Sequence, residues 1–260
     1  MRPNPGNLAS QRARKISRLC NDFAMLLKAA INGRRSQSEH PAIPINPSQQ
    51  AHQAVIAVAA GAGAIHVHPR NAGAHESLAS SDVAAALQAI RKACPTIPVG
   101  VSTGAWIVPD LDARLALIES WNVLPDFASV NFHEPGALEV FQLFTEKGIG
   151  VEAGIWNAEA AQLLYRSGLS SRCLRILIEP AQEPGNAKHR FEEIEAVLQG
   201  VQGSRLLHGF ETSAWEFIAL ASRRGYDTRI GFEDTLALPE GNLAQGNGDL
   251  VAAARQIIAR

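Results

Sequence analysis

Ala64-Ile65-His66-Val67-His68 is a short apolar run with the length of a buried strand. A helical pattern over 81–93 follows it, and a second strand-like run, Val99-Gly100-Val101-Ser102-Thr103, follows the helical pattern. A strand, a helix and a strand in this order form a βαβ unit, in which the two strands are parallel. This stretch therefore predicts an α/β fold.

The same unit recurs along the chain. Strand-like runs lie at Phe23–Ile31, Ala64–His68, Val99–Thr103, Phe127–Phe132, Gly148–Gly154, Leu174–Glu179, Arg205–Phe210 and Thr228–Phe232. A helical pattern follows each run, near 47–61, 81–93, 110–121, 135–146, 157–167, 189–199, 213–224 and 248–259. Eight βα units in about 240 residues predict a single (β/α)8 barrel, the TIM barrel. The main alternative is a doubly wound open sheet, which usually has fewer strands and a glycine-rich first turn that residues 31–35 lack.

The overall composition is that of an ordinary globular protein. Hydrophobic residues make up 46% and charged residues 19%, and the formal net charge is −1. This balance excludes a disordered chain and a broadly basic nucleic-acid binder. No apolar run approaches the roughly 18 residues that a membrane helix needs. We therefore expect no nucleic-acid or membrane partner. The three cysteines lie far apart and form no metal knuckle, which is typical of a protein in a reducing compartment, so we expect a cytoplasmic protein.

The N-terminal segment differs from the rest of the chain. Its first 20 residues contain five basic residues and no acidic residue. An organelle transit segment has a similar charge, but it also has an amphipathic stripe, which is missing here. We therefore expect residues 1–22 to form a poorly ordered extension and residues 23–260 to form the catalytic barrel domain.

Two histidines end the second strand-like run. His66 and His68 are two residues apart, so both side chains point to the same face of the strand. Active sites of TIM barrels lie at the carboxyl ends of the strands. A single histidine there is typical of a buried core residue, whereas a pair favours binding of zinc, iron, nickel or copper.

A carboxylate near the end of the eighth run could complete such a site. The eighth strand of a barrel closes beside the first, so Glu233 is expected to reach the ion held by His66 and His68. Two histidines and one carboxylate with an open position are typical of a catalytic metal site. The structural alternative is that the Glu233-Asp234 pair caps a helix and forms a solvated ion pair.

Further polar residues end other strands. Four of them, together with Arg229, could bind a substrate carboxylate: Ser102, Thr103, Ser129 and Asn131. For each residue alone, a turn or capping role is equally expected. Glu152, Glu179 and Glu211 also end strands, and any one of them could be an ion-paired structural acid. His208 is interpreted as a core histidine. Four tryptophans are interpreted as packing residues: Trp106, Trp121, Trp156 and Trp215.

In their order and spacing, these motifs resemble the β-keto acid cleavage enzymes, a family that includes 3-keto-5-aminohexanoate cleavage enzyme. The resemblance extends from about residue 24 to the end of the chain and is carried by Ala30–Gly33, Pro41–Pro47, His66–Arg70, Ser102–Gly104 and Arg229–Asp234. It implies a zinc-dependent (β/α)8 barrel and an acyltransferase that reacts a β-keto acid with acetyl-CoA. The products would be acetoacetate and a new acyl-CoA. It also implies a homo-oligomer, namely a tetramer.

The resemblance assigns roles to single residues. His66, His68 and Glu233 match the zinc ligands of the family. Asp234 and Arg229 match the pair linked to removal of the proton between the ketone and the carboxylate. Two hydroxyl positions near the substrate carboxylate match Ser102 and Ser129.

The chain departs from the family in the turn after the first strand. A family member has an acidic residue there, which helps to hold a cationic amine, whereas this chain has Arg34 and Arg35. We therefore expect Arg34 to contact a substrate that carries no amine and has a neutral or anionic distal group. Two further departures, at 180–186 and at Gly104-Ala105, lie where a CoA thioester would approach.

Two other functions remain open at this point. One is a metal-dependent aldolase or isomerase that acts on a small oxo-acid or a sugar phosphate and needs no thioester. The other is a non-catalytic barrel that binds a metal or a metabolite.

Overall fold

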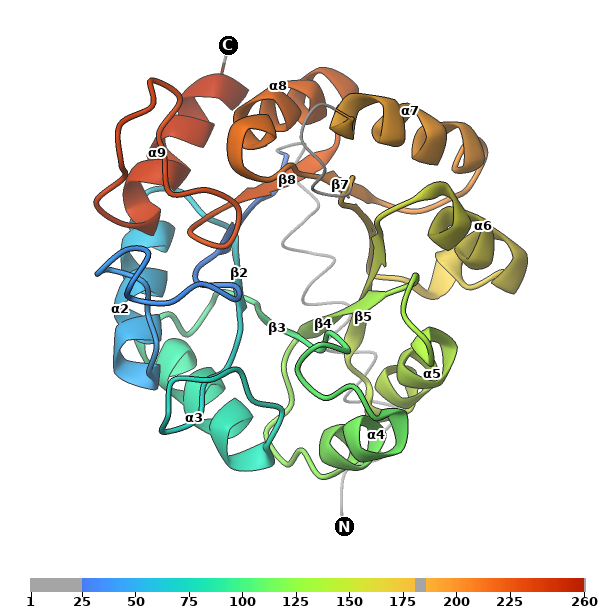
Figure 1. The fold of residues 1–260 in the computed structure, drawn as a ribbon, viewed down its shortest axis with the longest axis horizontal. Coiled ribbons are helices and arrows are strands. Elements are labelled where there is room, and N and C mark those ends of the chain that lie inside the picture. The colour runs from blue at the N-terminus through green and yellow to red at the C-terminus, as the bar shows by residue number, and fades with distance from the viewer. Residues whose placement is uncertain (1–24, 181–185, 260) are drawn as a thin grey trace.

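The computed structural model describes residues 25–180 and 186–259, so the predicted extension at 1–22 lies outside the described residues. Eight parallel strands close into a barrel in the order β1 to β8, and β1 is hydrogen-bonded to both β2 and β8. Helices surround this barrel (Figure 1). The predicted (β/α)8 fold is confirmed.

The elements follow the predicted alternation, and each predicted run or helical pattern coincides with one of them. The strands are β1 (Leu27–Ala30), β2 (Ala64–Val67), β3 (Val99–Ser102), β4 (Phe127–Asn131), β5 (Gly150–Ile155), β6 (Arg175–Ile178), β7 (Arg205–Leu207) and β8 (Asp227–Ile230). The helices are α2 (Pro47–Ala59), α3 (Ser80–Ala93), α4 (Leu111–Glu119), α5 (Ala137–Lys147), α6 (Ala158–Ser167), α7 (Ala187–Val197), α8 (Ala214–Arg224) and α9 (Asn247–Ile258). Short 3-10 turns are η1 (Ser170–Arg172) and η2 (Glu211–Ser213).

Polar caps begin several of these helices. The Asn46 side chain accepts a hydrogen bond from the Gln49 backbone at the start of α2, where Pro47 is the first helical residue. Asp110 and Asn157 cap α4 and α6 in the same way. Each cap satisfies a backbone N–H that the helix itself cannot pair.

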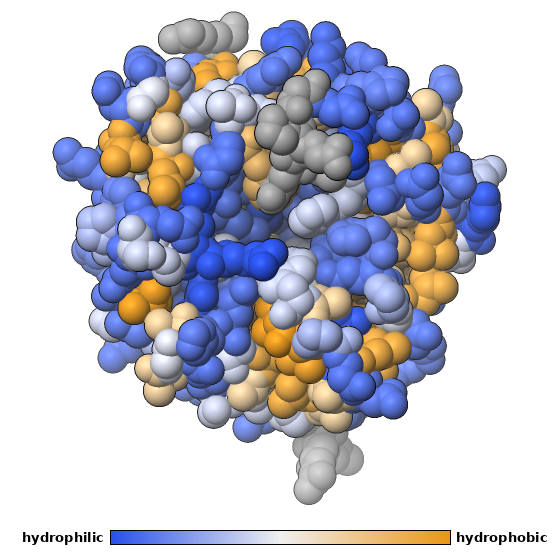
Figure 2. Space-filling view, in the orientation of Figure 1, coloured by the Kyte–Doolittle hydropathy of each residue, from blue (hydrophilic) through white to orange (hydrophobic). Residues whose placement is uncertain are grey.

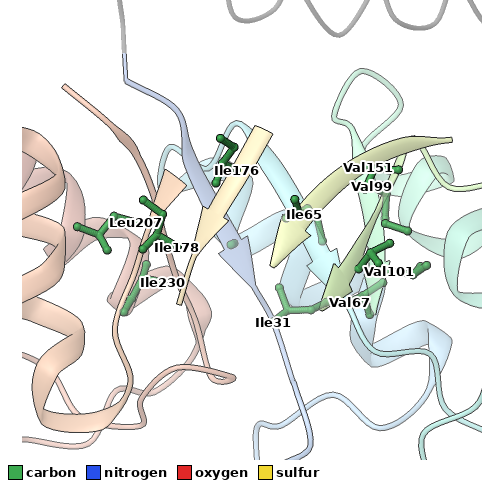
Figure 3. Close-up of a cluster of buried hydrophobic side chains, with 14 of the residues drawn as sticks. Ile31, Ile65, Val67, Val99, Val101, Val151, Ile176, Ile178, Leu207 and Ile230 are labelled. Carbon is green, nitrogen blue, oxygen red and sulfur yellow. The ribbon is translucent and has the colours of Figure 1, made fainter. Parts of the chain in front are cut away.

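Alternation of side chains along each strand separates the core from the barrel interior. Ile65, Val67, Val99 and Val101 are fully buried members of the hydrophobic cluster that packs against the helices (Figure 3). His66 alternates with them and therefore faces the interior. The apolar side chains of a strand thus pack against the helices, and the side chains between them point into the barrel, where polar residues can lie.

The barrel interior contains a buried group of charges, which we call the interior network: Lys28, Glu152 and Arg175. Glu152 Oε2 lies 2.5 Å from Lys28 Nζ, and Glu152 Oε1 lies 3.2 Å from an Arg175 nitrogen. Burial alone would raise the pKa of Glu152, but the two cations hold it below its usual value. Burial lowers the pKa of Lys28 despite its partner. The interpretation of Glu152 as an ion-paired acid is confirmed.

Most strands end earlier than predicted, and the difference is largest at β7 and β8. β7 ends at Leu207 rather than Phe210, so His208 lies directly after the strand, and β8 ends at Ile230 rather than Phe232, so Glu233 lies in the turn that follows it. The chain turns after β8 because the Gly231 carbonyl accepts hydrogen bonds from the Asp234 and Thr235 backbones. In the described ranges, no helix has the length and apolar character needed to span a membrane.

Candidate active site

A cavity of about 440 Å³ lies at the carboxyl ends of the strands. Hydrophilic residues surround the hollow at the centre of this face (Figure 2). Of the ten predicted site residues, eight line the cavity: Arg34, His66, His68, Ser102, Ser129, Asn131, Arg229 and Glu233. A larger cavity of about 630 Å³ is lined by residues of α2 and of the segment leading into α9 and contains none of the predicted residues, so the smaller cavity is the candidate active site.

Three side chains, which we call the mouth cluster, meet at one point: His66, His68 and Glu233. Their ligand atoms lie within 4.8 Å of one another. Glu233 Oε2 is 3.5 Å from His66 Nε2 and 3.3 Å from His68 Nε2. Both His68 Nε2 and Glu233 Oε2 are buried, and neither has a hydrogen-bond partner among the residues that the structure describes. Two imidazole nitrogens and a carboxylate with unpaired atoms fit a divalent transition-metal ion such as zinc.

Backbone geometry brings Glu233 to the two histidines. The Glu233 N–H donates to the Ala30 carbonyl, which ties the turn after β8 to the end of β1. Gly33 follows in the loop after β1 and has a φ of +57°. A Cβ at Gly33 would overlap the Glu233 side chain, so only glycine fits both the conformation and the space there.

Glu76 holds the second histidine from behind. Its Oε1 lies 2.5 Å from His68 Nδ1, and the Trp106 indole N–H donates to both Glu76 oxygens at 3.2–3.3 Å. Burial alone would lower the pKa of His68, but Glu233 and Glu76 raise it to about 9. A carboxylate on the outer nitrogen of a metal-binding histidine fixes its orientation and leaves Nε2 for the ion. No local pattern in the sequence indicated Glu76, because it reaches His68 only where the loop folds back at the Arg70–Glu76 bridge.

The other two members of the mouth cluster have different electrostatics. Burial holds the pKa of His66 well below its usual range, so its imidazole is neutral, as a metal ligand must be. Burial alone would raise the pKa of Glu233. The Arg229 charge and the two histidines instead hold it well below its usual range.

Arg229 joins the two adjacent acids. Its guanidinium donates to Asp234 Oδ1 at 2.7 and 3.2 Å and to Glu233 Oε1 at 2.8 Å. Asp234 is fully buried and does not itself line the cavity, and its Oδ2 has no hydrogen-bond partner in the described part of the chain. Arg229 thus occupies one oxygen of Asp234 and leaves the other available.

The hydroxyl and amide residues lie on neighbouring strands. Ser102 and Ser129 are in register on β3 and β4, and the buried Ser129 Oγ is unpaired within the described residues. The Asn131 amide donates to Glu134 at 2.9 Å. Thr103 does not line the cavity, because its hydroxyl donates to the Ser129 carbonyl at 2.7 Å and so supports β4.

The two arginines after β1 have different surroundings. Arg35 is paired with Glu39, at 3.2 Å, and with Glu211. Arg34 is exposed at the cavity and lies over the Trp106 ring, 5.4 Å from its centroid. Among the described residues, none forms a salt bridge with Arg34, so its charge is available to a ligand.

Comparison with known proteins identifies the family. The family model described as beta-keto acid cleavage enzyme matches residues 24–260. The chain belongs to the β-keto acid cleavage enzyme family. The resemblance noted from the motifs is therefore confirmed.

Two relatives have the same description. The chain is 25% identical over 249 residues to the 3-keto-5-aminohexanoate cleavage enzyme of Fusobacterium nucleatum subsp. nucleatum, covering 87% of this chain and 88% of that protein. It is 24% identical over 257 residues to the 3-keto-5-aminohexanoate cleavage enzyme of Acetoanaerobium sticklandii, covering 87% and 89%.

Solved structures share the fold. A binary complex of ObcA with oxaloacetate matches with a TM-score of 0.63 and 17% identity, over 83% of this chain and 63% of the ObcA chain. The tryptophan synthase alpha chain of Legionella pneumophila subsp. pneumophila matches with a TM-score of 0.58 and 15% identity, over 95% and 97%. At these identities the likeness shows the barrel fold alone.

Several residues at the candidate active site had been given only packing, ion-pair or core roles from the sequence. Trp106, Trp156 and Glu179 line the cavity, and His208 lies between Glu179 and Asp234. His208 is fully buried, as a core histidine would be, but its side-chain partners are two carboxylates, and its Nδ1 also lies 3.4 Å from the Gly209 carbonyl oxygen. Its position directly after β7, at the carboxyl end of a strand, was the available signal, and the overlong predicted strand obscured it.

Proposed function

We propose that the protein is a zinc-dependent β-keto acid cleavage enzyme that uses acetyl-CoA as its co-substrate. The observation that carries this proposal is the mouth cluster beside the Arg229–Asp234 pair, in a chain that belongs to this family. The proposed reaction converts a β-keto acid and acetyl-CoA into acetoacetate and a new acyl-CoA.

The reaction first forms one carbon–carbon bond and then breaks another. Loss of a proton from the carbon between ketone and carboxylate gives an enolate, which attacks the acetyl-CoA carbonyl and releases CoA. CoA then attacks the original ketone, and the bond between this carbon and the former enolate carbon breaks. The carbon fragment regains the proton and leaves as acetoacetate. Atoms balance without an oxidant or reductant.

Asp234 is the proposed base. Arg229 holds its Oδ1, so the unpaired Oδ2 is the atom that accepts the proton and later returns it. His66, His68 and Glu233 would hold the zinc ion, which when bound supplies Lewis-acid stabilisation of charge on the keto oxygen. The neutral state of His66 and the ionised state of Glu233 suit this role.

The substrate carboxylate is proposed to bind at the ends of β3 and β4. Ser102 and Ser129 present hydroxyl groups there, Asn131 lies next to them, and Thr103 supports the strand backbone. Arg34 is proposed to contact the distal part of the substrate. These groups orient the carbon acid before proton removal.

The direct test is to incubate the metal-loaded protein with a panel of β-keto acids, with and without acetyl-CoA. Mass spectrometry should detect acetoacetate and a new acyl-CoA only when both substrates are present. Products that form without acetyl-CoA would instead support the aldolase or isomerase alternative. Stoichiometric metal without turnover of any keto acid would support a non-catalytic binding barrel. The homotetramer expected from the family is tested by light scattering.

A further inference from the structure

His208 lies between two buried carboxylates at the ends of three neighbouring strands. Its Nδ1 is 3.3 Å from Asp234 Oδ1, and its Nε2 is 2.9 Å from Glu179 Oε2. His208 and Asp234 are fully buried, and Glu179 is only 5% exposed. The three side chains therefore form a continuous chain from the proposed base after β8, through β7, to the end of β6.

The charges of this chain are complementary. Burial and the Arg229 charge act to lower the pKa of His208, but Asp234 and Glu179 outweigh them and raise it above its ordinary value. A protonated imidazole has an N–H on each nitrogen and can donate to both carboxylates. When protonated, His208 places a positive charge between two acids that otherwise repel each other in a buried position.

His208 and Arg229 constrain Asp234 from two sides. Both approach the same oxygen, Oδ1: His208 from the position directly after β7, and Arg229 from β8. A carboxylate held by a single partner can still rotate about its bond to Cβ, whereas two partners on different strands define its plane. The unpaired Oδ2 therefore has a defined position relative to the cavity.

Glu179 orients the imidazole in turn. Its second oxygen, Oε1, accepts a hydrogen bond from the Trp156 indole at 3.3 Å, and the Phe210 ring packs against His208 with centroids 4.9 Å apart. The histidine ring is therefore held at its Nε2 and along one side. On the opposite side, Nδ1 lies 3.3 Å from Asp234 Oδ1 and 3.4 Å from the Gly209 carbonyl oxygen, and the contact with Asp234 leads toward the proposed proton transfer.

We propose that His208 and Glu179 are positioning residues that hold the Asp234 carboxylate in the orientation needed for proton removal. This inference rests on the proposed function, in which Asp234 is the base. Neither residue contacts the reacting carbon in this mechanism, since both act through Asp234.

The test compares His208 variants that keep one or neither of its two carboxylate contacts, with Asp234 and with Glu179. His208→Ala removes both contacts. His208→Asn keeps an amide donor near the Nδ1 position, facing Asp234, whereas His208→Gln places its amide near Nε2, facing Glu179. His40→Asn is the matched control: His40 is also buried, and its Nδ1 accepts from the Ala42 backbone, which an Asn oxygen can replace.

Two readouts separate positioning from a general structural role. The first is kcat and KM for the keto acid. The second is exchange of the substrate's C2 hydrogens with D2O without acetyl-CoA, measured by NMR above the uncatalysed rate. In His208→Ala we expect both kcat and exchange to fall about 10- to 100-fold, because a small misplacement of a catalytic group has effects of this size. KM should change by less than about threefold.

The pattern among the variants decides the outcome. His208→Asn should recover most of the lost exchange, His208→Gln should recover little, Glu179→Gln should fall between them, and bound metal should be unchanged in all. An exchange rate in His208→Ala within about twofold of wild type would overturn the positioning role but leave the proposed function standing. If that variant does not fold, equal exchange in His208→Asn and His208→Gln would overturn it. A wild-type protein that exchanges no keto acid would overturn the proposed function as well.

Discussion

Two buried polar groups inside the same barrel differ in how they are paired. In the interior network, both oxygens of Glu152 accept hydrogen bonds from cations, one from Lys28 and one from Arg175. In the mouth cluster, His68 Nε2 and Glu233 Oε2 face each other at 3.3 Å, and neither has a hydrogen-bond partner over 25–180 and 186–259. Both groups are built on interior-facing positions of the strands or on the turns that follow them.

The difference indicates what each group is for. An unpaired buried polar atom destabilises a fold by about 1–3 kcal/mol, so a structure keeps several of them together only where a ligand completes them. In the interior network both carboxylate oxygens are paired with cations, and Arg175 Nε is the one buried atom without a hydrogen-bond partner among the described residues. The mouth cluster leaves atoms free for an ion and a substrate. Variants in the two groups should therefore fail in different ways.

The largest effect is expected at the mouth cluster. His66→Ala, His68→Ala and Glu233→Gln should each lose bound metal, and activity should fall about 10³-fold or more, because Lewis-acid stabilisation contributes several kcal/mol. Elemental analysis and the acyl-CoA assay measure the two losses. Full stoichiometric metal in all three variants would remove the basis for the proposed mechanism.

The interior network should respond in stability instead. Glu152→Gln leaves Lys28 buried without its counter-charge and should lower the free energy of unfolding by about 3–5 kcal/mol at pH 7. The pKa of Glu152 in the folded state lies below its ordinary 4.5, so its contribution is present above that pH and is lost as the pH falls through the folded value. The deficit should therefore shrink toward pH 4. Urea unfolding at several pH values checks this, with the exposed Glu240→Gln as control. A deficit that does not vary with pH would contradict the assignment.

A smaller effect is expected one contact away from the ion. Glu76→Gln should weaken metal binding about 10- to 100-fold, because it removes the carboxylate that orients His68. Competition with a chelating dye gives the affinity, and Glu240→Gln again serves as control. Unchanged affinity in Glu76→Gln would show that His68 needs no such support.

The smallest effect is expected at the substrate entrance. Arg34→Gln should reduce kcat/KM about two- to fivefold for a dicarboxylic β-keto acid, since an exposed ion pair contributes up to about 1 kcal/mol. A neutral keto acid of similar size should be unaffected in the same variant. Better turnover of amino-substituted than of neutral or dicarboxylic substrates by the wild-type protein would contradict the role of Arg34.

Local sequence patterns were sufficient to predict the barrel and the pairing of His66 with His68. Apolar runs and helical patterns depend on neighbours a few positions away, so they located eight strands and eight helices within the described ranges. The two-residue spacing placed His66 and His68 on one face, and the closure of a barrel predicted that Glu233 would join them. All three predictions follow from general geometry rather than from particular contacts.

Glu76, Glu179 and His208 could not be assigned in this way. Glu76 reaches His68 across a folded loop, and His208 meets acids 29 and 26 positions away in the sequence, Glu179 and Asp234. No periodicity relates such positions, because the contacts depend on where each strand ends and how the following loop turns. The chain's pattern of residues thus specified the barrel and the types of donor at its mouth. Packing of distant segments determined which donors meet, because hydrogen bonds act over about 3 Å and sequence spacing fixes positions only within one element.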